Sequence, residues 1–502
     1  MQLTLTMPMN WLTKFSCIFL RRVLFLALVL LFSDSFVDHA SAQDGRPLVL
    51  RGVVAIDPAS GVAVPDAVIV LRAGRIAAVG ARSKVKVPPG APTLDLRGKY
   101  VMPGLMDAHV HYGLGPLPDL LAWGVTGVLV TGQPDSLEPY RRTAAPDSAS
   151  VPRFFSVGQP FAAKDGWGDF GPGSAHFPAT VEEAQVEIRA ARSAGADALK
   201  VIYDDMSWLR STQMPMLPEP VLGAIISEAH RLGLRVFVHA PILEHAKVAL
   251  RSGADGLVHG IISERVDEEF LALMRRNRAT YTATLSLYEA LADRQGTVKR
   301  LRALDRAHRV PVRVWEELLD PQALTRYRTY YDRADSVAVR MGTARENVSR
   351  VAAAGIPVVA GTDTPVPGVI AGVSSQAELL LLEEAGLKPM QVLRAATTVP
   401  ASLVDSATRM GTLRSGAVAD LLVLDADPRT TTRHVGTLAW VVRGGRAYRP
   451  REIAAARAPA PRRLRGGRRT AGEVAGGLRC QARGTRTQLG RFAIGRVGVD
   501  LG

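Results

Sequence analysis

The chain has 502 residues, of which 47% are hydrophobic and 22% charged, and its formal net charge is +15. This composition supports a large buried core and excludes a chain that is disordered throughout. Residues 451–502 hold twelve arginines and three acidic residues, and residues 1–42 carry +1, which leaves only +5 for the part between. Because that part is only mildly basic, the charge does not predict a nucleic-acid partner.

The first residues have the pattern of a secretory signal. Lys14, Arg21 and Arg22 precede the apolar run Val23–Phe32, and the small residues Ala40-Ser41-Ala42 follow. We expect a signal peptide cleaved after Ala42 and a periplasmic or secreted product. An uncleaved membrane anchor is the alternative, but an apolar run of about ten residues falls short of the roughly 20 that a span needs. No later segment predicts a stable membrane span.

Two stretches near the ends of the chain share the character of β-structure. Residues 48–100 are rich in Val, Ile, Gly and Pro and contain a hairpin-like segment at 66–80. Residues 411–449 repeat this character at 420–424 and 440–448. We predict that the two stretches pair as one small β-sandwich domain, with a structural role.

Between them, residues 101–410 alternate strand-like apolar runs with helical patterns, which indicates parallel βαβ units. The predicted fold is α/β, a (β/α)8 TIM-like barrel. Its expected strands are Leu105–His111, Gly127–Thr131, Arg153–Val157, Ala198–Tyr203, Arg235–His239, Gly256–His259, Thr280–Leu285 and Pro357–Asp363.

Potential metal ligands lie at the ends of several of these strands. His109 and His111 are one residue apart on a strand, so both side chains point to the same face. Neutral imidazole is a common ligand of zinc-like ions. Further candidates close later apolar runs, and in a barrel all these strand ends meet at one rim. They are Lys200, His239, His259 and Asp363.

The order of these residues resembles that of the amidohydrolase superfamily, in particular metal-dependent hydrolases similar to imidazolonepropionase and to prolidase-like and ochratoxinase-like enzymes. The resemblance covers roughly Leu48 to Tyr448. The segment Lys99-Tyr-Val-Met-Pro-Gly-Leu-Met-Asp-Ala-His109 resembles the family's first barrel strand. The segment Gly411-Thr-Leu-Arg-Ser-Gly-Ala-Val-Ala-Asp-Leu-Leu-Val-Leu424 resembles its return to a small β domain.

The resemblance implies two divalent metal ions, with zinc the expected metal. His109, His111 and Asp363 would hold one ion, His239 and His259 would hold the other, and Lys200 would bridge them. An ammonium group offers no acceptor, so this lysine is expected to be a carbamate derived from carbon dioxide. Asp363 is the expected catalytic residue, as the shuttle for the proton of a metal-bridging hydroxide. Alternatively, Asp363 caps a helix and Lys200 is a surface lysine.

Other residues are candidates for substrate contacts. His176, in the glycine-rich loop 166–178, would orient the substrate or face solvent. Tyr203 would donate a hydrogen bond to a developing oxyanion or pack in the core. A carboxylate-bearing substrate needs a cation, for which Arg210 and Arg265 are candidates. Rim aromatic residues are expected as pocket walls or as core, and two further histidines as structural; these are Trp167, Trp208 and Tyr288, and His230 and His245.

Two segments limit the argument about substrate. Residues 287–351 form a long, charged, helix-rich insertion, which is either a lid over the rim or an extension of the outer helix layer. After the second strand, relatives have a Thr-Val-Arg-Asp-like segment, whereas this chain has Gly127-Val-Leu-Val-Thr131-Gly132. The arginine that is missing there means that the relatives' substrates do not transfer directly to this chain.

The sequence therefore predicts an exported binuclear-metal amidohydrolase that cleaves an amide bond in a small peptide-like or N-acyl amino-acid substrate. Cyclic amides, lactones and phosphotriesters remain alternatives, as does a non-catalytic binding protein on the same fold. The Arg-, Gly- and Ala-rich residues 450–502 are expected to be a disordered tail. The sequence does not predict the oligomeric state.

Overall fold

The computed structural model describes residues 46–111, 117–132, 151–404 and 409–455. The chain divides into two compact units, residues 1–458 and 459–502, and the second lies outside the described residues. The predicted signal peptide also lies outside them. In the described ranges, every helix is too short or too polar to cross a membrane.

Eight short strands form the centre of the larger unit and pair in parallel within two sheets. Most of their residues are buried, because helices cover parallel strands and leave little room for polar side chains. One sheet has the order β6-β7-β8 and the other β13-β12-β11-β10-β9. Their bounds are β6 Leu105–Val110, β7 Val125–Val130, β8 Arg153–Ser156, β9 Leu199–Ile202, β10 Val236–His239, β11 Gly256–Val258, β12 Thr280–Thr282 and β13 Val358–Val359.

Backbone hydrogen bonds outside the named strands link the two sheets at both junctions. The N–H of Phe161, beyond β8, donates to the carbonyl of Lys200 in β9 at 2.8 Å. At the other junction, the N–H of Ala108 in β6 donates to Ala360 at 3.1 Å and that of Asp363 donates to His109 at 2.8 Å. The result is an α/β fold of the TIM-barrel kind, with two parallel sheets in place of the one continuous sheet that the sequence predicts.

Two of the predicted strands are shorter than expected. The seventh ends at Thr282 because helix α8 begins at Leu285, and the eighth is reduced to Val358–Val359. Asp363 therefore follows its strand at a distance of four residues instead of ending it. Its φ of +67° lies in the left-handed region, which is incompatible with continued strand geometry.

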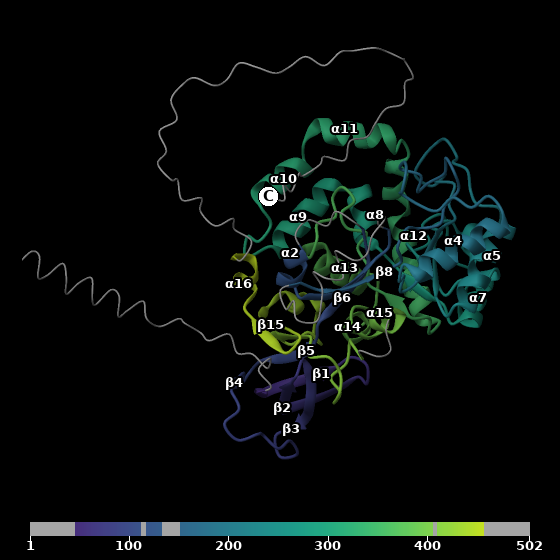
Figure 1. Cartoon of the computed structure of the whole chain (residues 1–502). Helices are drawn as coiled ribbons and strands as arrows, with labels where there is room; N and C mark the ends of the chain where they lie inside the picture. The colour runs from purple at the N-terminus through teal and green to yellow at the C-terminus, as the bar shows by residue number, and fades with distance from the viewer. Residues whose placement is uncertain (1–45, 112–116, 133–150, 405–408, 456–502) are drawn as a thin grey trace, which may run out of the picture. The chain divides into compact units, whose positions relative to one another are not determined.

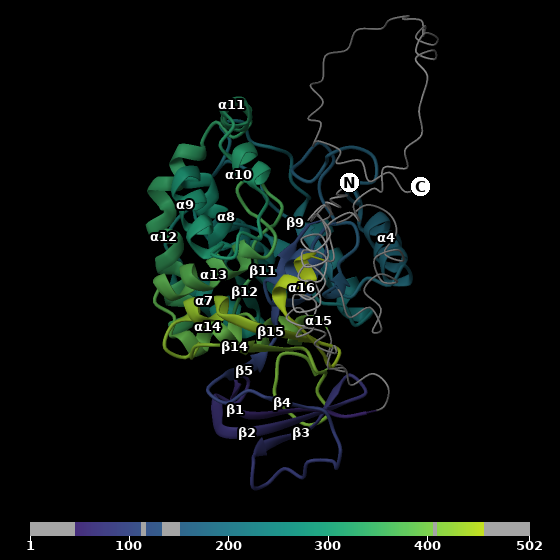
Figure 2. The ribbon, with the colours of Figure 1, turned by 90° about the vertical axis from the view of Figure 1, so that its left-hand side faces the viewer.

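Helices alternate with these strands and surround them (Figures 1 and 2). Helix α4 begins with a capping box, in which Thr180 accepts from the N–H of Glu183 and the Glu183 side chain accepts from the N–H of Thr180. The helices outside the insertion are α2 Leu117–Ala122, α4 Val181–Ser193, α5 Glu219–Arg231, α6 Leu243–Arg251, α7 Glu268–Asn277, α13 Val373–Glu384, α14 Pro389–Ala395, α15 Thr398–Val404, the 3-10 helix η1 Thr432–Gly436 and α16 Pro450–Ala455.

Helix α16 corrects one prediction. The first six residues of the expected disordered tail are helical, and α16 contacts α2 and β15. Ile453 is buried in the main apolar cluster, which gives this short helix a reason to fold. Residues 456–502 lie outside the described residues.

The two β-rich ends of the chain form a single eight-stranded sheet at the bottom of Figure 1. Its path is β16-β15-β14-β5-β1-β2-β3, with β4 paired to β1. The ends meet where β5 pairs antiparallel with β14. The predicted pairing of the ends is present, but the described residues form one sheet and do not confirm a sandwich. The strands are β1 Leu48–Asp57, β2 Val62–Arg72, β3 Arg75–Ala81, β4 Thr93–Asp95, β5 Tyr100–Pro103, β14 Leu421–Leu424, β15 Leu438–Arg443 and β16 Arg446–Tyr448.

The insertion folds as five helices, and α12 takes the second of the two expected roles. Helix α12 packs against α8 and buries Val337, Ala344 and Val348, so it extends the outer helix layer. Helix α11 lies at the top of Figure 1, at the end of the unit opposite the large sheet. The bounds are α8 Leu285–Ala292, α9 Arg294–Leu304, α10 Val312–Leu318, α11 Pro321–Tyr330 and α12 Ala334–Ala353.

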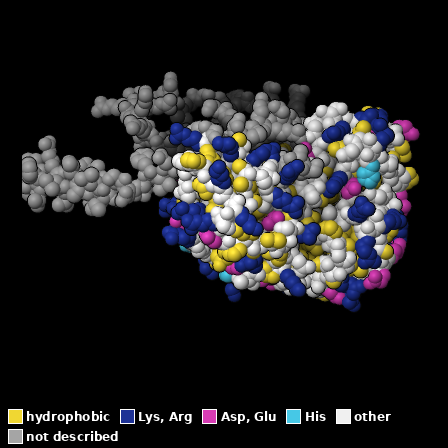
Figure 3. Space-filling view, turned by 90° about the horizontal axis from the view of Figure 1, so that it is seen from below, with side chains coloured by type: hydrophobic (Ala, Val, Ile, Leu, Met, Phe, Trp, Pro, Cys, Tyr) yellow, Lys and Arg dark blue, Asp and Glu magenta, His cyan; other side chains and the backbone are white. Residues whose placement is uncertain are grey.

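Basic side chains do not gather in one patch on the face seen from below. Figure 3 shows Lys and Arg side chains spread over this face among hydrophobic and acidic ones. The distribution agrees with the low net charge of the body of the chain.

Candidate metal centre

Four predicted ligands converge on one point beyond strand β6. The Nε2 atoms of His109 and His111 lie 3.3 Å apart, and the Nζ of Lys200 lies 3.3 Å from the His109 Nε2. The Oδ1 of Asp363 lies 3.0 Å from the His109 Nε2 and 2.7 Å from the His111 Nε2. Residues from β6, β9 and the segment after β13 thus place four polar atoms around a single small volume.

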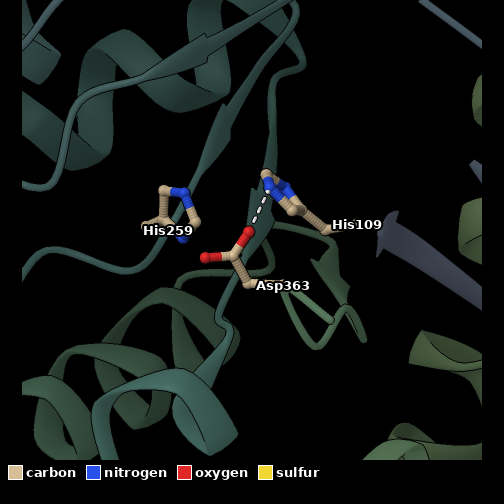
Figure 4. A group of neighbouring side chains, drawn as sticks. All are labelled: His109, His259 and Asp363. Carbon is tan, nitrogen blue, oxygen red and sulfur yellow. Dashed lines mark ion pairs between the residues drawn. The ribbon is translucent and has the colours of Figure 1, made fainter. Parts of the chain in front are cut away.

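The remaining two predicted ligands adjoin this group. The ring centroid of His259 lies 4.7 Å from that of His109 and 4.5 Å from that of His239. Figure 4 shows the Asp363 carboxylate between the rings of His109 and His259. All six predicted ligands therefore form one contiguous group, here called the ligand cluster.

The ligand cluster is buried except for His111, which is partly exposed, and desolvation shifts the pKa of several of its members. Desolvation, with a contribution from Lys200, lowers the pKa of His109 to about 3, and desolvation also lowers the pKa of His111 and of His259. Burial lowers the pKa of Lys200 to about 8, against the attraction of Asp363. Burial alone would raise the pKa of Asp363, but the neighbouring imidazole rings lower it well below its usual value. Neutral imidazoles and an ionised carboxylate are the forms that bind metal ions.

The donor set fits a divalent cation. The Oδ1 of Asp363 is buried and, within the described residues, accepts no hydrogen bond of acceptable geometry, although two ring nitrogens lie within 3.0 Å of it. Buried polar atoms normally have partners, so acceptors crowded together in this way need a cation between them. Imidazole nitrogens with a carboxylate oxygen are typical ligands of zinc. His109, His259 and Asp363 each place a ligand atom within 4.8 Å of the others.

The carboxylate of Asp107, which the sequence analysis did not assign, connects His109 to the segment that carries Asp363. The Oδ1 of Asp107 accepts from the N–H of His109 at 3.3 Å and of Thr362 at 3.1 Å. Its Oδ2 accepts from the hydroxyls of Thr362 at 2.8 Å and Ser375 at 2.9 Å. Burial raises the pKa of Asp107 to about 6, and these hydrogen bonds oppose that rise. Asp107 thereby ties β6 to the segment that carries Asp363.

His259 is fixed from its far side. The Oγ1 of Thr284 lies 2.9 Å from its Nδ1, which leaves Nε2 as the free ligand atom. His259, Thr284 and Asp363 have φ of +68°, +44° and +67°. Non-glycine residues rarely adopt this left-handed conformation, and such strain is concentrated at functional sites.

His239 is fixed by Asp204, another residue that the sequence analysis missed. The Oδ2 of Asp204 lies 2.9 Å from the His239 Nε2 and accepts from the indole N–H of Trp208 at 2.8 Å. Nδ1 of His239 is thus its free ring nitrogen. His245, expected to be structural, lies with Nδ1 3.9 Å from Asp204 Oδ1. The sequence contained one signal for Asp204, which is its position two residues after the end of strand β9.

The two weaker site candidates lie at different distances from the cluster. The ring of Tyr203 is buried 5.8 Å from that of His245, and its N–H donates to the carbonyl of His239 at 3.0 Å. The ring of His176 instead stacks on Phe161, and its Nδ1 lies 3.7 Å from a carboxylate oxygen of Glu187 in α4. The structure therefore brings Tyr203, and not His176, next to a predicted ligand.

Aromatic side chains from the insertion meet the loop after β8. The ring of Trp167 lies 6.2 Å from that of Tyr331 and 6.5 Å from that of Tyr330, and Tyr327 lies 4.8 Å from Tyr331. The charge of Asp363 contributes to raising the pKa of Tyr327 and Tyr331, after burial as the main cause. These four residues are here called the aromatic wall, and two of them, Tyr327 and Tyr331, interact electrostatically with Asp363.

The other aromatic and histidine candidates are packed within the fold. Trp208 and Tyr288 are buried with their rings 5.7 Å apart, and the Tyr288 hydroxyl donates to the carbonyl of Gly260 at 2.5 Å. His230 of α5 pairs with Asp255 at 2.8 Å. Neither residue belongs to the ligand cluster, which agrees with a structural role.

Comparison with known proteins agrees with this architecture. Residues 100–447 match the Amidohydrolase family. An uncharacterized protein of Mycobacterium bovis is 26% identical over 392 residues, which cover 74% of this chain and 91% of that protein. A candidate prolidase from Bifidobacterium longum has a similar structure, with a TM-score of 0.65, 26% identity and coverage of 82% of this chain and 98% of its own.

A second similar structure is a prolidase complexed with N-methylphosphonate-L-proline, with a TM-score of 0.64, 25% identity and coverage of 80% of this chain and 99% of its own. The family match spans more than half of the chain and includes all six residues of the ligand cluster. We conclude that the chain belongs to the amidohydrolase family and is a hydrolase that acts on carbon–nitrogen bonds.

Proposed function

We propose that the protein is an exported hydrolase with two divalent metal ions, preferably zinc, which cleaves the amide bond of an N-acyl amino acid or a short peptide. The observation that carries this proposal is the buried convergence of His109, His111, Lys200 and Asp363 around one point. The similarity to prolidases supports a peptide-like substrate. The signal-like pattern of residues 1–42 supports export.

Two groups of side chains would hold the ions. His109, His111 and Asp363 form one group, and His239 and His259 form the other. When bound, a pair of divalent ions lowers the pKa of a water molecule between them and polarises a substrate carbonyl. Asp204 and Thr284 hold the two histidines of the second group in fixed orientations.

Lys200 would bridge the two groups as a carbamate. Its side chain is 3% exposed, and within the described residues no carboxylate forms an ion pair with it. A protonated lysine at this place would put a positive charge among metal ligands and offer no acceptor. The neutral amine can combine with carbon dioxide, which gives two ligand oxygens and removes that conflict.

Asp363 would move the proton. Its carboxylate lies beside His109 and His111, and the neighbouring imidazoles lower its pKa, which favours the ionised form. A carboxylate in this position can accept a proton from the attacking water and deliver it to the leaving nitrogen. The left-handed backbone at Asp363 aims the carboxylate into the cluster.

Metal analysis together with a substrate panel tests the proposal. We expect about two zinc ions per chain by mass spectrometry of the purified protein, and hydrolysis of N-acyl amino acids or dipeptides in preference to lactones and phosphotriesters. We expect Lys200→Ala to retain about one ion. If the protein without substitutions binds only one ion, Lys200 does not bridge two ions. If it turns over only lactones or phosphotriesters, the amide substrate is excluded.

Asp363→Asn separates catalysis from folding. Asparagine keeps the size of the side chain but cannot accept a proton, so we expect kcat to fall at least about 100-fold while the fold is retained. The control is Asp335→Asn, because the Asp335 side chain is 87% exposed on α12. Full turnover by Asp363→Asn would remove Asp363 from the mechanism, and retained metal without any amide turnover in the native enzyme would favour a binding protein.

A further inference from the structure

An arginine without an acidic partner lies against the aromatic wall. Arg294 is the first residue of α9, and its Cζ lies 5.2 Å from the ring centroid of Tyr327. Its Nε is buried and has no hydrogen-bond partner among the described residues, and no acidic side chain in those ranges forms an ion pair with it. The hydroxyl of Tyr327 is likewise buried without a described partner.

One contact places Arg294 beside the loop that follows Asp363. The guanidinium packs over Gly368, five residues after Asp363, so closely that a Cβ at that position would clash with it. On the other side, Tyr327 belongs to the aromatic wall and is affected by the charge of Asp363. Arg294 therefore lies between Gly368, in the loop after Asp363, and Tyr327 of helix α11.

A charged side chain with a buried donor is costly unless that donor has a partner. Arg294 is partly buried, its Nε has no partner among the described residues, and desolvation lowers its pKa. The planar guanidinium has the geometry to bind a carboxylate through two parallel hydrogen bonds. An anionic ligand would satisfy Arg294, and the Tyr327 hydroxyl would supply another donor to the same group.

We propose that Arg294 and Tyr327 bind the free α-carboxylate of the substrate, so that the enzyme selects amides whose amine portion is an amino acid. This inference rests on the proposed function and narrows its substrate class to N-acyl amino acids and dipeptides with a free C-terminus. The aromatic wall next to this site favours an apolar side chain on that amino acid.

The other two arginines considered from the sequence have partners of their own. Arg210 stacks on Tyr330 at 4.6 Å, and its Nη1 lies 3.4 Å from the sulfur of Met214. Arg265 is 61% exposed and pairs with Glu346 at 2.8 Å. Arg294 therefore has the stronger claim to the substrate carboxylate.

The test compares each substrate with its neutral counterpart. The probes are N-acetyl-L-phenylalanine and L-alanyl-L-phenylalanine, each with its C-terminal amide, and the assay measures cleavage of the internal amide by the metal-loaded full-length enzyme. We expect kcat/KM to be about 10- to 100-fold higher for the acids than for their amides. Arg294→Met should abolish that preference, mainly by raising KM for the acids.

Three further variants complete the design. Tyr327→Phe should reduce the preference several-fold, and Arg294→Lys should keep part of it because the charge remains without the planar fork. Arg302→Met is the matched control, since Arg302 lies on the same helix and stacks on Trp315, and it should leave the preference intact. If Arg294→Met does not fold, the proposal is decided by the acid-to-amide ratio of kcat/KM, measured in the native enzyme and in Tyr327→Phe.

The outcomes separate the two proposals. Equal kcat/KM for acids and amides in the native enzyme, or an undiminished preference in Arg294→Met, would overturn the role of Arg294 and leave the proposed function standing. If the metal-loaded enzyme cleaves none of the four compounds, the proposed function itself fails, and this inference fails with it.

Discussion

Within the ligand cluster, His239 and His259 each have their own polar support. Thr284 contacts the Nδ1 of His259, and Asp204 contacts the Nε2 of His239. The two histidines thus present different ring nitrogens to the cluster, because their supports lie on different sides. Such contacts fix ring orientation and tautomer, which makes them part of the metal site although they touch no metal.

Removing the support of His239 should weaken metal binding. In Asp204→Ala, His239 and the Trp208 indole both lose their acceptor, and we expect zinc affinity to fall about 10- to 100-fold. Asp204→Asn should lose less zinc affinity, because its amide oxygen can still accept a hydrogen bond. The measurement is competition for zinc with a chelating dye.

The neighbouring residue supplies the control for this variant. Asp205 accepts from the N–H of Ser207 and from Gln213 and does not contact His239, so Asp205→Ala should bind zinc normally. Equal zinc affinity in Asp204→Ala and Asp205→Ala would show that Asp204 has no positioning role.

At the residue scale, the sequence identified the ligands, which lie at the ends of predicted strands. It did not identify residues whose role depends on a contact with another part of the chain. The six ligands follow strands in order, so their convergence could be predicted from the fold alone. Asp204, Thr284 and Arg294 act through neighbours that are distant in the sequence, such as His259 and Thr284, which are 25 residues apart. No spacing rule connects such pairs.

Elements were predicted where a local signal defines them. Apolar runs located the strands, but their ends depend on pairing with neighbours, as β12 and β13 show. Whether the insertion forms a lid or an outer layer depends on tertiary contacts, and α12 belongs to the outer layer. The start of α4, for which we made no prediction, carries a local signal, because its capping box lies within four residues.

The capping box gives a prediction at the scale of this element. Thr180 is exposed, so Thr180→Ala removes only the acceptor for the Glu183 N–H and should destabilise the start of α4 by about 1 kcal/mol. We expect faster amide hydrogen exchange in the first turn of α4, with activity unchanged. Thr180→Ser keeps the hydroxyl and is the control; identical exchange in both variants would deny the cap a stabilising role.

In the whole molecule, buried charges join the large sheet to the parallel strands. Asp420, next to β14, pairs with Arg153 of β8 at 2.6 Å, and its Oδ1 lies 3.7 Å from a guanidinium nitrogen of Arg443. Arg443 is fully buried and donates to the carbonyl of Val151 at 3.0 Å. The sequence did not predict this network, because it joins residues up to 292 positions apart.

Neutralising Asp420 should destabilise the whole fold. Asp420→Asn leaves the buried Arg443 and the partly buried Arg153 without this countercharge, and we expect the free energy of unfolding to fall by about 3–5 kcal/mol in urea denaturation. Burial alone would raise the pKa of Asp420, but Arg153 and Arg443 lower it on balance. Its stabilising contribution is therefore present above pH 3.8 and is lost as the pH falls below that value, so the difference between variant and native protein should shrink there.

An exposed pair provides the comparison for this variant. Asp425 pairs with Lys99 at 2.6 Å, and its side chain is 54% exposed. Asp425→Asn should cost less than about 1 kcal/mol. Equal losses for the two variants would mean that the buried network contributes no more than a surface ion pair.

The pairing of β5 has a consequence for how the chain is made. Strand β5 hydrogen-bonds to β1 on one side and to β14 on the other, and residues 104–420 separate β5 from β14. On the ribosome, the first strands emerge long before their last partner, so the nascent chain carries an open strand edge for most of its synthesis. A product terminated before residue 421 keeps that edge permanently and is expected to aggregate, even if every residue of the ligand cluster has been made.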